Sequence, residues 1–315
     1  MMSRRLILAV ATLALATPAL AQDLVKVAIG QRGGWDSSMY EIGMMKGIFQ
    51  KHGLKVETLW TQGSGETVQT VISGAVDVGG ASGTTGVMAA FARGAPVRPI
   101  GNSMTGADDL FWYVKKDSPL KSMKEAAGKT IAYSTNGSST HLAVLGFQRH
   151  FGIKMKLTAA GSPPAVLTQV LSNQIDIGWS SPPLVVEQLR EGIVRILARE
   201  SEVPEFRDQT VRMTIANLNF INSRPDVLDR LRKAYQEVVD WMYEGDEVFD
   251  VFQKFVGTAP DISREVRASF FPKKNLDMTR LSGLEHAMRD AIELKFLAQP
   301  LTKDQMEEFT RYYVK

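Results

Sequence analysis

The sequence predicts an α/β fold made of two similar lobes that enclose a cleft. Three features point to this fold. One stretch of the chain occurs twice, at an offset of 99 residues. Strands and helices alternate along both halves, which is typical of a mostly parallel sheet flanked by helices. Two extended segments join the halves, so we expect each lobe to move on a double hinge.

The repeat is the strongest of these features. Residues 69–83 read QTVISGAVDVGGASG, and residues 168–182 read TQVLSNQIDIGWSSP, so that Asp77 matches Asp176. A fixed internal period indicates a duplicated structural unit. Each copy predicts an apolar-faced helix, a short β-branched strand and a loop rich in Gly and Ser. Ligands of open α/β sheets bind outside the carboxyl ends of the strands, so the two loops are expected to face each other across a cleft.

The elements of the first lobe follow one another in a regular order. Alternation of apolar residues predicts strands over 23–30, 54–60 and 75–78, and helices after 37, 63 and 83. The strand at 110–114 precedes a restart of the pattern at 128–133. A helix beginning at Pro225 has apolar residues spaced three and four apart and is expected to face the core.

These elements predict a division of the chain into four parts. We expect residues 1–21 to be a signal peptide, 22–114 to form the first part of lobe 1, and 115–212 to form lobe 2. Residues 213–315 would return through the hinge and complete lobe 1 with helices. The two crossings between lobes are expected at 110–115 and 213–221.

The N-terminal residues predict export. Arg4 and Arg5 precede an apolar run over 6–16, and Ala19-Leu20-Ala21 has the small-x-small pattern of a signal-peptidase site. The run is shorter than a membrane span. We therefore expect cleavage after Ala21 and a soluble protein in the periplasm, with no lipid anchor because the chain contains no cysteine.

Composition excludes several functions. Residues 1–21 contain two arginines and no acidic residue, so the rest of the chain has 35 Lys and Arg against 34 Asp and Glu, a net charge of +1. Such a balance disfavours a nucleic-acid partner, which needs a dense basic face. The absence of cysteine excludes disulfides and thiolate chemistry. We expect a monomer without cofactor or metal.

The whole exported chain resembles one family. The signal peptide, the restart at 117–132 (DSPLKSMKEAAGKTIA) and the paired Val-Asp-Val-Gly and Ile-Asp-Ile-Gly strands are similar to periplasmic solute-binding proteins of ABC importers for nitrate, sulfonate, taurine and thiamine precursors. This resemblance implies the two-lobed type II periplasmic binding protein fold, a small-molecule ligand and a permease in the inner membrane as partner. Eukaryotic thiamine-precursor synthases share the fold but carry a cysteine-rich motif that this chain lacks.

Catalysis finds little support in the sequence. The four histidines have no metal-binding spacing, and His52 and His150 fall at equivalent places in the repeat, which favours a structural role. Ser138 and Ser139 beside His141 could suggest a nucleophile and its base, but serines at a helix start are usually caps. We therefore expect a binding protein, and an exported enzyme on the same fold is the alternative.

The loop at 134–140 is the best candidate for binding an anion. A helix N-terminus has unpaired N–H groups and a partial positive charge. The other two helix starts of lobe 2 contain proline pairs, which remove donors. This loop has no proline and offers five polar candidates. They are Ser134, Asn136, Ser138, Ser139 and Thr140. Plain capping is the alternative role for each hydroxyl.

Lobe 1 offers two matching helix starts. Thr84, following Ser82 and Gly83, opens a helix without a nearby charge. Ser64 and Gly65 open another, although Glu66 would repel an anion there. The ligand expected from these donors is a small sulfonate or carboxylate, and a pyrimidine-type thiamine precursor is the alternative ligand.

Two further pairs complete the expected site. Arg32 and Asp36 lie in the first cleft loop and could bind opposite charges on a ligand, although Arg32 could equally be solvated. Trp35 and Trp179, the latter followed by Ser180, fall at strand ends of different lobes. We expect the two indoles to hold the ligand between them, with core packing as the alternative.

Overall fold

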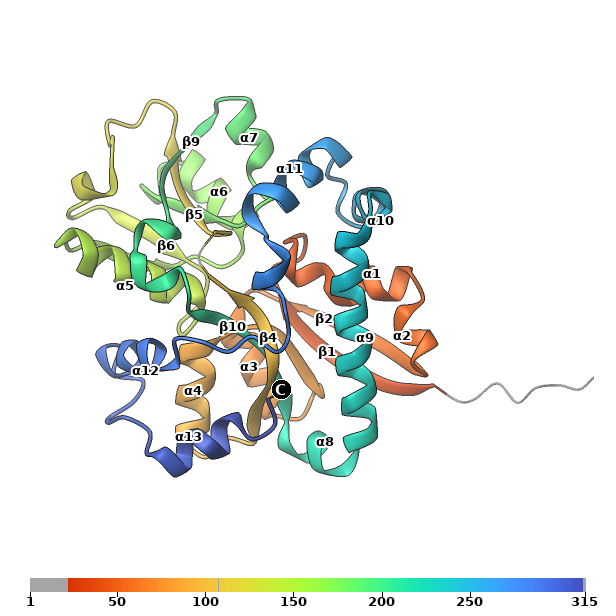
Figure 1. The fold of residues 1–315 in the computed structure, drawn as a ribbon. Coiled ribbons are helices and arrows are strands. Elements are labelled where there is room, and N and C mark those ends of the chain that lie inside the picture. Colours follow the sequence, from red (N-terminus) through yellow and green to blue (C-terminus); the bar gives the residue numbers. More distant parts are fainter. Residues whose placement is uncertain (1–21, 107, 314–315) are drawn as a thin grey trace, which may run out of the picture.

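The computed structural model describes residues 22–313 except 107, and these form two lobes with a sheet in each (Figure 1). The expected signal peptide lies outside the described residues. Lobe 1 has a five-stranded sheet of order β2-β1-β3-β10-β4. Its strands are β1 (Asp23–Gly30), β2 (Leu54–Thr61), β3 (Val78–Gly83), β4 (Val97–Thr105) and β10 (Thr210–Asn217). Within the described part of the chain, no helix is long and apolar enough to cross a membrane.

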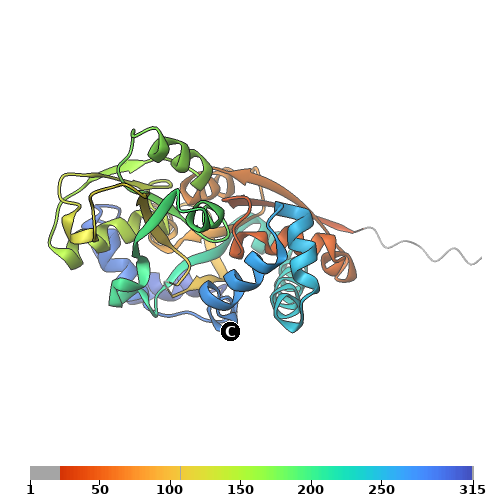
Figure 2. The same cartoon turned by 90° about the horizontal axis from the view of Figure 1, so that it is seen from above.

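Helices cover both faces of the lobe 1 sheet and build a hydrophobic core on each. One face is covered by η1 (Asp36–Ser38), α1 (Met39–Met45), α2 (Ile48–Lys51), α8 (Leu218–Ser223), α9 (Pro225–Glu244), α10 (Glu247–Val256), α11 (Pro260–Phe270) and η5 (Lys273–Asn275). The other is covered by α3 (Ser64–Ile72), α4 (Thr84–Ala92), α12 (Leu284–Glu293) and α13 (Lys303–Thr310). Figure 2 shows the teal and cyan α9 and α10 on the opposite side of the molecule from the dark blue C-terminal helices. The predicted core-facing helix at Pro225 is thus confirmed as α9.

Lobe 2 repeats the strand order of lobe 1. Its strands are β5 (Phe111–Lys115), β6 (Thr130–Tyr133), β7 (Lys156–Ala159), β8 (Gly178–Ser180) and β9 (Val194–Arg199). Sheets β8-β5-β9 and β6-β7 are linked by a parallel bridge between Ile131 and Ile177. The combined order β7-β6-β8-β5-β9 matches β2-β1-β3-β10-β4 strand for strand. The helices are η2 (Met123–Glu125), α5 (Ser139–Phe151), α6 (Pro163–Leu171), α7 (Val186–Arg190), η3 (Glu200–Glu202) and η4 (Pro204–Phe206).

The repeated residues have the same structural task in both lobes. Asp77 accepts a hydrogen bond from the backbone N–H of Lys26 at 2.8 Å, and Asp176 accepts one from that of Thr130, also at 2.8 Å. Each carboxylate thereby ties the start of its strand to the neighbouring parallel strand, β1 in lobe 1 and β6 in lobe 2. Two strand glycines repeat as well. A Cβ on Gly79 or Gly178 would lie within 3 Å of the preceding helix's valine, so glycine is needed for this close packing.

The hinge lies a few residues away from the predicted crossings. β5 belongs to the lobe 2 sheet and β10 to the lobe 1 sheet, so the chain crosses between β4 and β5 and again between β9 and β10. The expected boundaries at 114 and 212 are corrected accordingly. Each inserted strand runs antiparallel to both of its neighbours. The other four strands of each lobe all run in one direction, so the expected mostly parallel sheets are confirmed, each with one antiparallel strand inserted.

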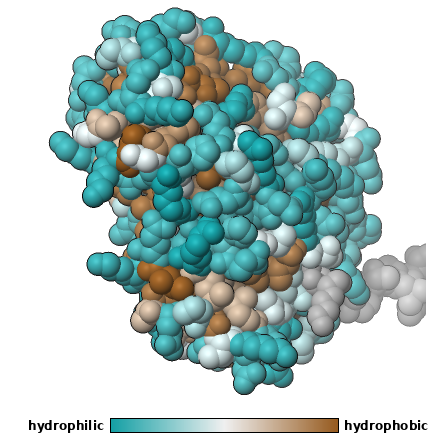
Figure 3. Space-filling view, turned by 60° about the vertical axis from the view of Figure 1, so that its left-hand side comes forward, coloured by the Kyte–Doolittle hydropathy of each residue, from teal (hydrophilic) through white to brown (hydrophobic). Residues whose placement is uncertain are grey.

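The surface seen in Figure 3 is predominantly hydrophilic, with apolar residues in separate areas. Of the large apolar side chains described, those with the greatest exposure are distributed over both lobes. They are Met45, Leu59, Leu171 and Ile193. Scattered apolar residues of this kind are normal on a soluble protein surface.

Candidate functional site

The carboxyl ends of the parallel strands of both lobes meet at the lobe junction. The backbone N–H of Gly65 donates to Oγ1 of Thr135 at 2.9 Å, and the N–H of Gly86 donates to the carbonyl of Gly137 at 3.2 Å. A Cβ on Gly83 would lie only 2.5 Å from the Gly137 oxygen. Glycine at position 83 therefore allows the two lobes to touch through their backbones.

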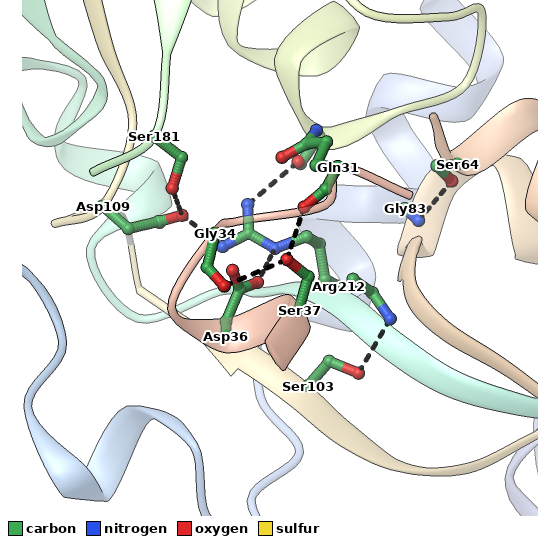
Figure 4. A network of polar contacts seen from close by, with 12 residues as sticks. Gln31, Gly34, Asp36, Ser37, Ser64, Gly83, Ser103, Asp109, Ser181 and Arg212 are labelled. Atoms are coloured by element: carbon green, nitrogen blue, oxygen red, sulfur yellow. Dashed lines mark hydrogen bonds and ion pairs between the residues drawn. The ribbon is translucent and has the colours of Figure 1, made fainter. Parts of the chain in front are cut away.

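A buried arginine lies at the centre of this junction (Figure 4). Arg212, which is 5 % exposed, pairs through Nε with Asp36 at 3.1 Å and through Nη2 with Asp109. Its Nη1 donates to Oγ of Ser139 at 3.2 Å. Asp36 comes from lobe 1, Asp109 from the first crossing and Ser139 from lobe 2. A single side chain thus contacts both lobes and the hinge.

Local structure explains how these groups meet. Arg212 lies on β10, directly beside Gly83 at the end of β3, so its side chain begins where α4 starts. Asp36 lies on η1, in the loop that follows β1. Ser181 follows β8 and its hydroxyl reaches Asp109 at 3.5 Å. The sheet order therefore delivers charged groups from three chain segments to one place.

The charges at this junction are not balanced one to one. Burial raises the pKa of Asp109 to about 6, although the neighbouring Arg212 acts in the opposite direction. Burial, reinforced by the nearby Asp109, raises the pKa of Glu200 well above its ordinary value. Burial therefore disfavours the charged form of Glu200, while Asp36 and Asp109 share one guanidinium. Such a cluster is stable only while all its members are present.

Two helix starts point at the same junction. The hydroxyl of Ser138 caps α5 by accepting from the N–H of His141 at 3.1 Å, and Thr84 on α4 donates to the carbonyl of Thr210 at 2.6 Å. Ser82 and Thr85 are buried, and neither hydroxyl has a hydrogen-bond partner among the described residues. The positive ends of α4 and α5 both lie beside Arg212, since Gly83 pairs with Arg212 in the sheet and Ser139 accepts from its Nη1.

The structure brings most of the predicted site residues to the junction, in two groups. Asp36 and Ser139 contact Arg212, while Ser82, Thr84 and Ser138 lie at the starts of α4 and α5. The others, Ser64, Gly65 and Asn136, border a pocket of about 170 Å³ between the lobes. Its lining residues are Ser64, Gly65, Val68, Gln69, Gly86, Ala89, Ala90, Arg93, Asn136, Gly137 and Phe296.

Other predicted residues have structural tasks. Thr140 accepts from the backbone N–H of Ser134 at 2.9 Å, which fixes the loop before α5. Ser180 donates to the carbonyl of Leu184 at 2.9 Å. The guanidinium of Arg32 lies over the ring of Phe255, 5.1 Å from its centroid, and does not reach the junction.

The expected pair of ligand-binding tryptophans is corrected. Trp35 is fully buried, and its ring centroid lies 5.0 Å from that of Phe252 in the core of lobe 1. Trp179 is equally buried, opposite Trp112 in the sheet of lobe 2. Both tryptophans therefore have the alternative role of core packing, because each indole belongs to the hydrophobic core of its own lobe.

The sequence analysis included Asp36 but missed Arg212, Asp109 and Glu200. Arg212 stands in a strand whose neighbours are otherwise apolar or small, and Asp109 precedes the apolar run 110–114. A charge inside a buried strand was the signal that could have identified Arg212. Asp109 and Glu200 carried no comparable signal, because their proximity depends on the antiparallel crossings.

The histidines offer no alternative centre within the described residues. Burial lowers the pKa of His141 to about 4, so its ring is neutral, and it stacks on Tyr133 at 4.2 Å between centroids. His52 binds Glu237 at 2.8 Å on the lobe 1 surface. Among the residues that the structure covers, no group of three or more His, Asp or Glu is placed to hold a metal ion.

Comparison with known proteins identifies the family. The profile of the family described as NMT1/THI5 like matches residues 38–247, about two thirds of the chain. The chain belongs to the NMT1/THI5-like family. One curated protein to which the chain is similar is 4-amino-5-hydroxymethyl-2-methylpyrimidine phosphate synthase of Aspergillus parasiticus. The two are 22 % identical over 271 residues, and the alignment covers 81 % of this chain and 77 % of that protein.

Solved structures show the same fold. The alkanesulfonate-binding protein SsuA of Xanthomonas axonopodis, bound to MOPS, superposes with a TM-score of 0.72 at 15 % identity, covering 95 % of this chain and 96 % of that one. The periplasmic nitrate-binding protein NrtA of Synechocystis gives 0.72 at 13 % identity, covering 92 % and 86 %. The NMT1/THI5-like chain therefore has the two-lobed periplasmic binding protein fold that its sequence predicts.

Proposed function

We propose that this protein is the periplasmic solute-binding component of an ABC importer, which captures a small organic anion between its lobes and delivers it to a membrane permease. The ligand would be a sulfonate or a carboxylate. Support comes from the fold, from neighbours whose names state sulfonate and nitrate binding, and from the chemistry of the junction. The protein would act as a monomer after removal of residues 1–21.

The observation that carries this proposal is the position of Arg212. Its side chain begins beside the start of α4 and its Nη1 contacts Ser139 at the start of α5, so the dipoles of both helices favour an anion near this guanidinium. Separation of the lobes would break its contact with Ser139. An incoming anion could then bind Arg212 and the N-terminal N–H groups of α5, and the lobes would close on it.

Asp36 and Asp109 occupy the guanidinium of Arg212 that a ligand anion would bind. In this structure they neutralise Arg212, which would otherwise be a buried unpaired charge. A ligand anion competes with them for the same guanidinium. Because the pKa of Asp109 is already raised to about 6, its carboxyl can take up a proton when it is displaced. Anion binding would therefore be stronger at pH 6 than at pH 8.

One observation favours a second ligand. The curated relative is named as a synthase of a pyrimidine phosphate, so a pyrimidine-type ligand whose N–H groups donate to Asp36 or Asp109 is the alternative. Synthesis itself is not part of the proposal. The eukaryotic synthases carry a cysteine-rich motif, and this chain has no cysteine.

A thermal-shift screen tests the proposal. Purified protein is heated with alkanesulfonates, small carboxylates and aminopyrimidines, and a ligand at 100 times its Kd should add about 2.7 kcal/mol of stability. We expect a hit among the anions, recovered unchanged by mass spectrometry after prolonged incubation. Stabilisation by pyrimidines alone would show that the ligand is a pyrimidine and not an organic anion. Consumption of the compound would show that the protein is an enzyme and not a binding protein.

A further inference from the structure

Two arginines of lobe 2 cross the lobe boundary and bind acidic pairs on lobe 1 helices. Figure 1 shows α5 beside α12, and α7 beside α11, at separate places along this boundary. On each lobe 1 helix the two carboxylates are spaced three or four residues apart, so they lie on one face. Both contacts lie away from the polar network around Arg212.

The first contact is made by Arg149 near the end of α5. Its Nη2 lies 2.8 Å from Oδ1 of Asp290, and its Nη1 lies 2.7 Å from Oε2 of Glu293, both on α12. Asp290 is fully buried and forms no hydrogen bond with any described residue, so its charge is compensated mainly by an arginine from the other lobe. Glu205 of lobe 2 binds the same arginine at 2.6 Å and holds it in place.

The second contact is made by Arg190 at the end of α7. Its Nη1 lies 3.1 Å from Oδ2 of Asp261, and its Nη2 lies 2.6 Å from Oε2 of Glu265, both on α11. The three side chains are partly exposed. Each arginine therefore extends a fork of two donors to two carboxylates, which is the geometry that guanidinium groups favour.

We propose that Arg149 and Arg190 are positioning residues that hold the two lobes together and so set the fraction of closed protein. Neither side chain touches the junction where a ligand would bind. An exposed ion pair changes an equilibrium by a factor of about 1.4 to 5. The four pairs together would favour the closed arrangement by at least about fourfold, and a ligand that needs closed lobes would gain up to the same factor.

The test measures the lobe distance without any ligand, so it does not depend on the proposed transport function. Because the chain has no cysteine, Leu59→Cys on β2 and Ala159→Cys on β7 place two nitroxide labels on exposed edge strands of opposite lobes. Pulsed electron paramagnetic resonance then gives the distribution of distances between them. The labelled protein is compared with the same protein carrying Arg149→Gln and Arg190→Gln.

We expect a mainly short distance in the parent and a longer population, increased at least fourfold, in the double variant. Raising the salt to about 1 M, where the Debye length is about 3 Å, should shift the parent in the same direction without any substitution. The control is Arg264→Gln on α11, whose partner Asp246 belongs to the same lobe. Circular dichroism confirms folding.

Two results would overturn the proposal. One is a distance distribution in the folded double variant that superimposes on that of the parent. The other is a parent protein that shows only the long distance at low salt, because the arginines would then not hold the lobes together.

Discussion

Replacing Arg212 with methionine tests the junction most severely. Arg212 and Asp36 are each 5 % exposed and Asp109 is fully buried, and methionine keeps much of the arginine stem while removing its charge. Removing one partner from a buried ion pair costs about 3–5 kcal/mol, because the remaining charge is left unpaired. We expect Arg212→Met to lower the free energy of unfolding by about 3 kcal/mol at pH 8.

The cost should depend on pH. Burial already raises the pKa of Asp109 to about 6 with Arg212 present, and without the arginine this carboxyl will hold its proton to still higher pH. At pH 5 the variant can therefore neutralise the buried acid, and its deficit should fall to about half or less. Urea unfolding followed by circular dichroism at both pH values measures the difference.

Two comparisons separate this explanation from a general packing defect. The triple variant Asp36→Asn, Asp109→Asn, Arg212→Met removes all three charges and should recover most of the lost stability. Arg264→Met, in an exposed pair with Asp246, should cost less than about 1 kcal/mol. The reasoning is refuted if Arg212→Met and Arg264→Met are equally mild, or if the triple variant is no more stable than Arg212→Met alone.

Three further predictions concern the buried acid of α12, the repeat and the tryptophans. Burial raises the pKa of Asp290 from 3.8 to about 6, so the protonated carboxyl stabilises the fold fully below about pH 4, and this contribution is lost as the pH rises through 6. Relative to Asp290→Asn, the native protein should therefore lose on the order of 3 kcal/mol of unfolding free energy between pH 4 and 7 in urea titrations. A difference between the two proteins that stays constant with pH would contradict the raised pKa. Asp77→Asn and Asp176→Asn should each cost about 1 kcal/mol and should add in the double variant, because the two hydrogen bonds lie in different lobes; strong non-additivity in denaturation would argue against equivalent, separate tasks. Trp35→Ala and Trp179→Ala should each lower the free energy of unfolding by about 3–5 kcal/mol, because both indoles are buried in the core. If calorimetry finds either variant as stable as the native protein, that tryptophan is not a core residue and is again a candidate for contacting the ligand.

The fold was predictable because its signals are local and repeated. The match of Asp77 with Asp176 identified two equivalent lobes, and each carboxylate binds the equivalent neighbouring strand of its lobe, β1 or β6. The antiparallel insertion of β5 and β10 was not predictable from periodicity. Both strands are buried, and an apolar run does not reveal the direction of its neighbours.

The candidate site was predictable where a chemical group lies at a helix start. Ser82, Thr84 and Ser138 were proposed because a helix start can bind an anion, and the structure places them at the starts of α4 and α5, where Ser138 acts as a cap. Arg212 and Asp109 were missed because the two residues are far apart in sequence and are brought together only where the chain passes between the lobes. Trp35 and Trp179 were misplaced because a strand end can face the core as well as a cleft, and the sequence does not distinguish the two.

If a solute is bound between lobes that close on it, an obstruction at the contact between the lobes must weaken binding, and calorimetric titration of Gly83→Ala measures this effect. The added Cβ would lie 2.5 Å from the Gly137 oxygen and 2.9 Å from Cα of Ser138, so it obstructs closure without removing any polar side chain. The control is Gly245→Ala, where a Cβ meets nothing within 4 Å. With the compound found by thermal shift, the native protein and Gly245→Ala should bind one equivalent with equal affinity, whereas Gly83→Ala should bind at least about tenfold more weakly, which is 1.4 kcal/mol. Equal affinity of a folded Gly83→Ala variant would contradict binding between closing lobes.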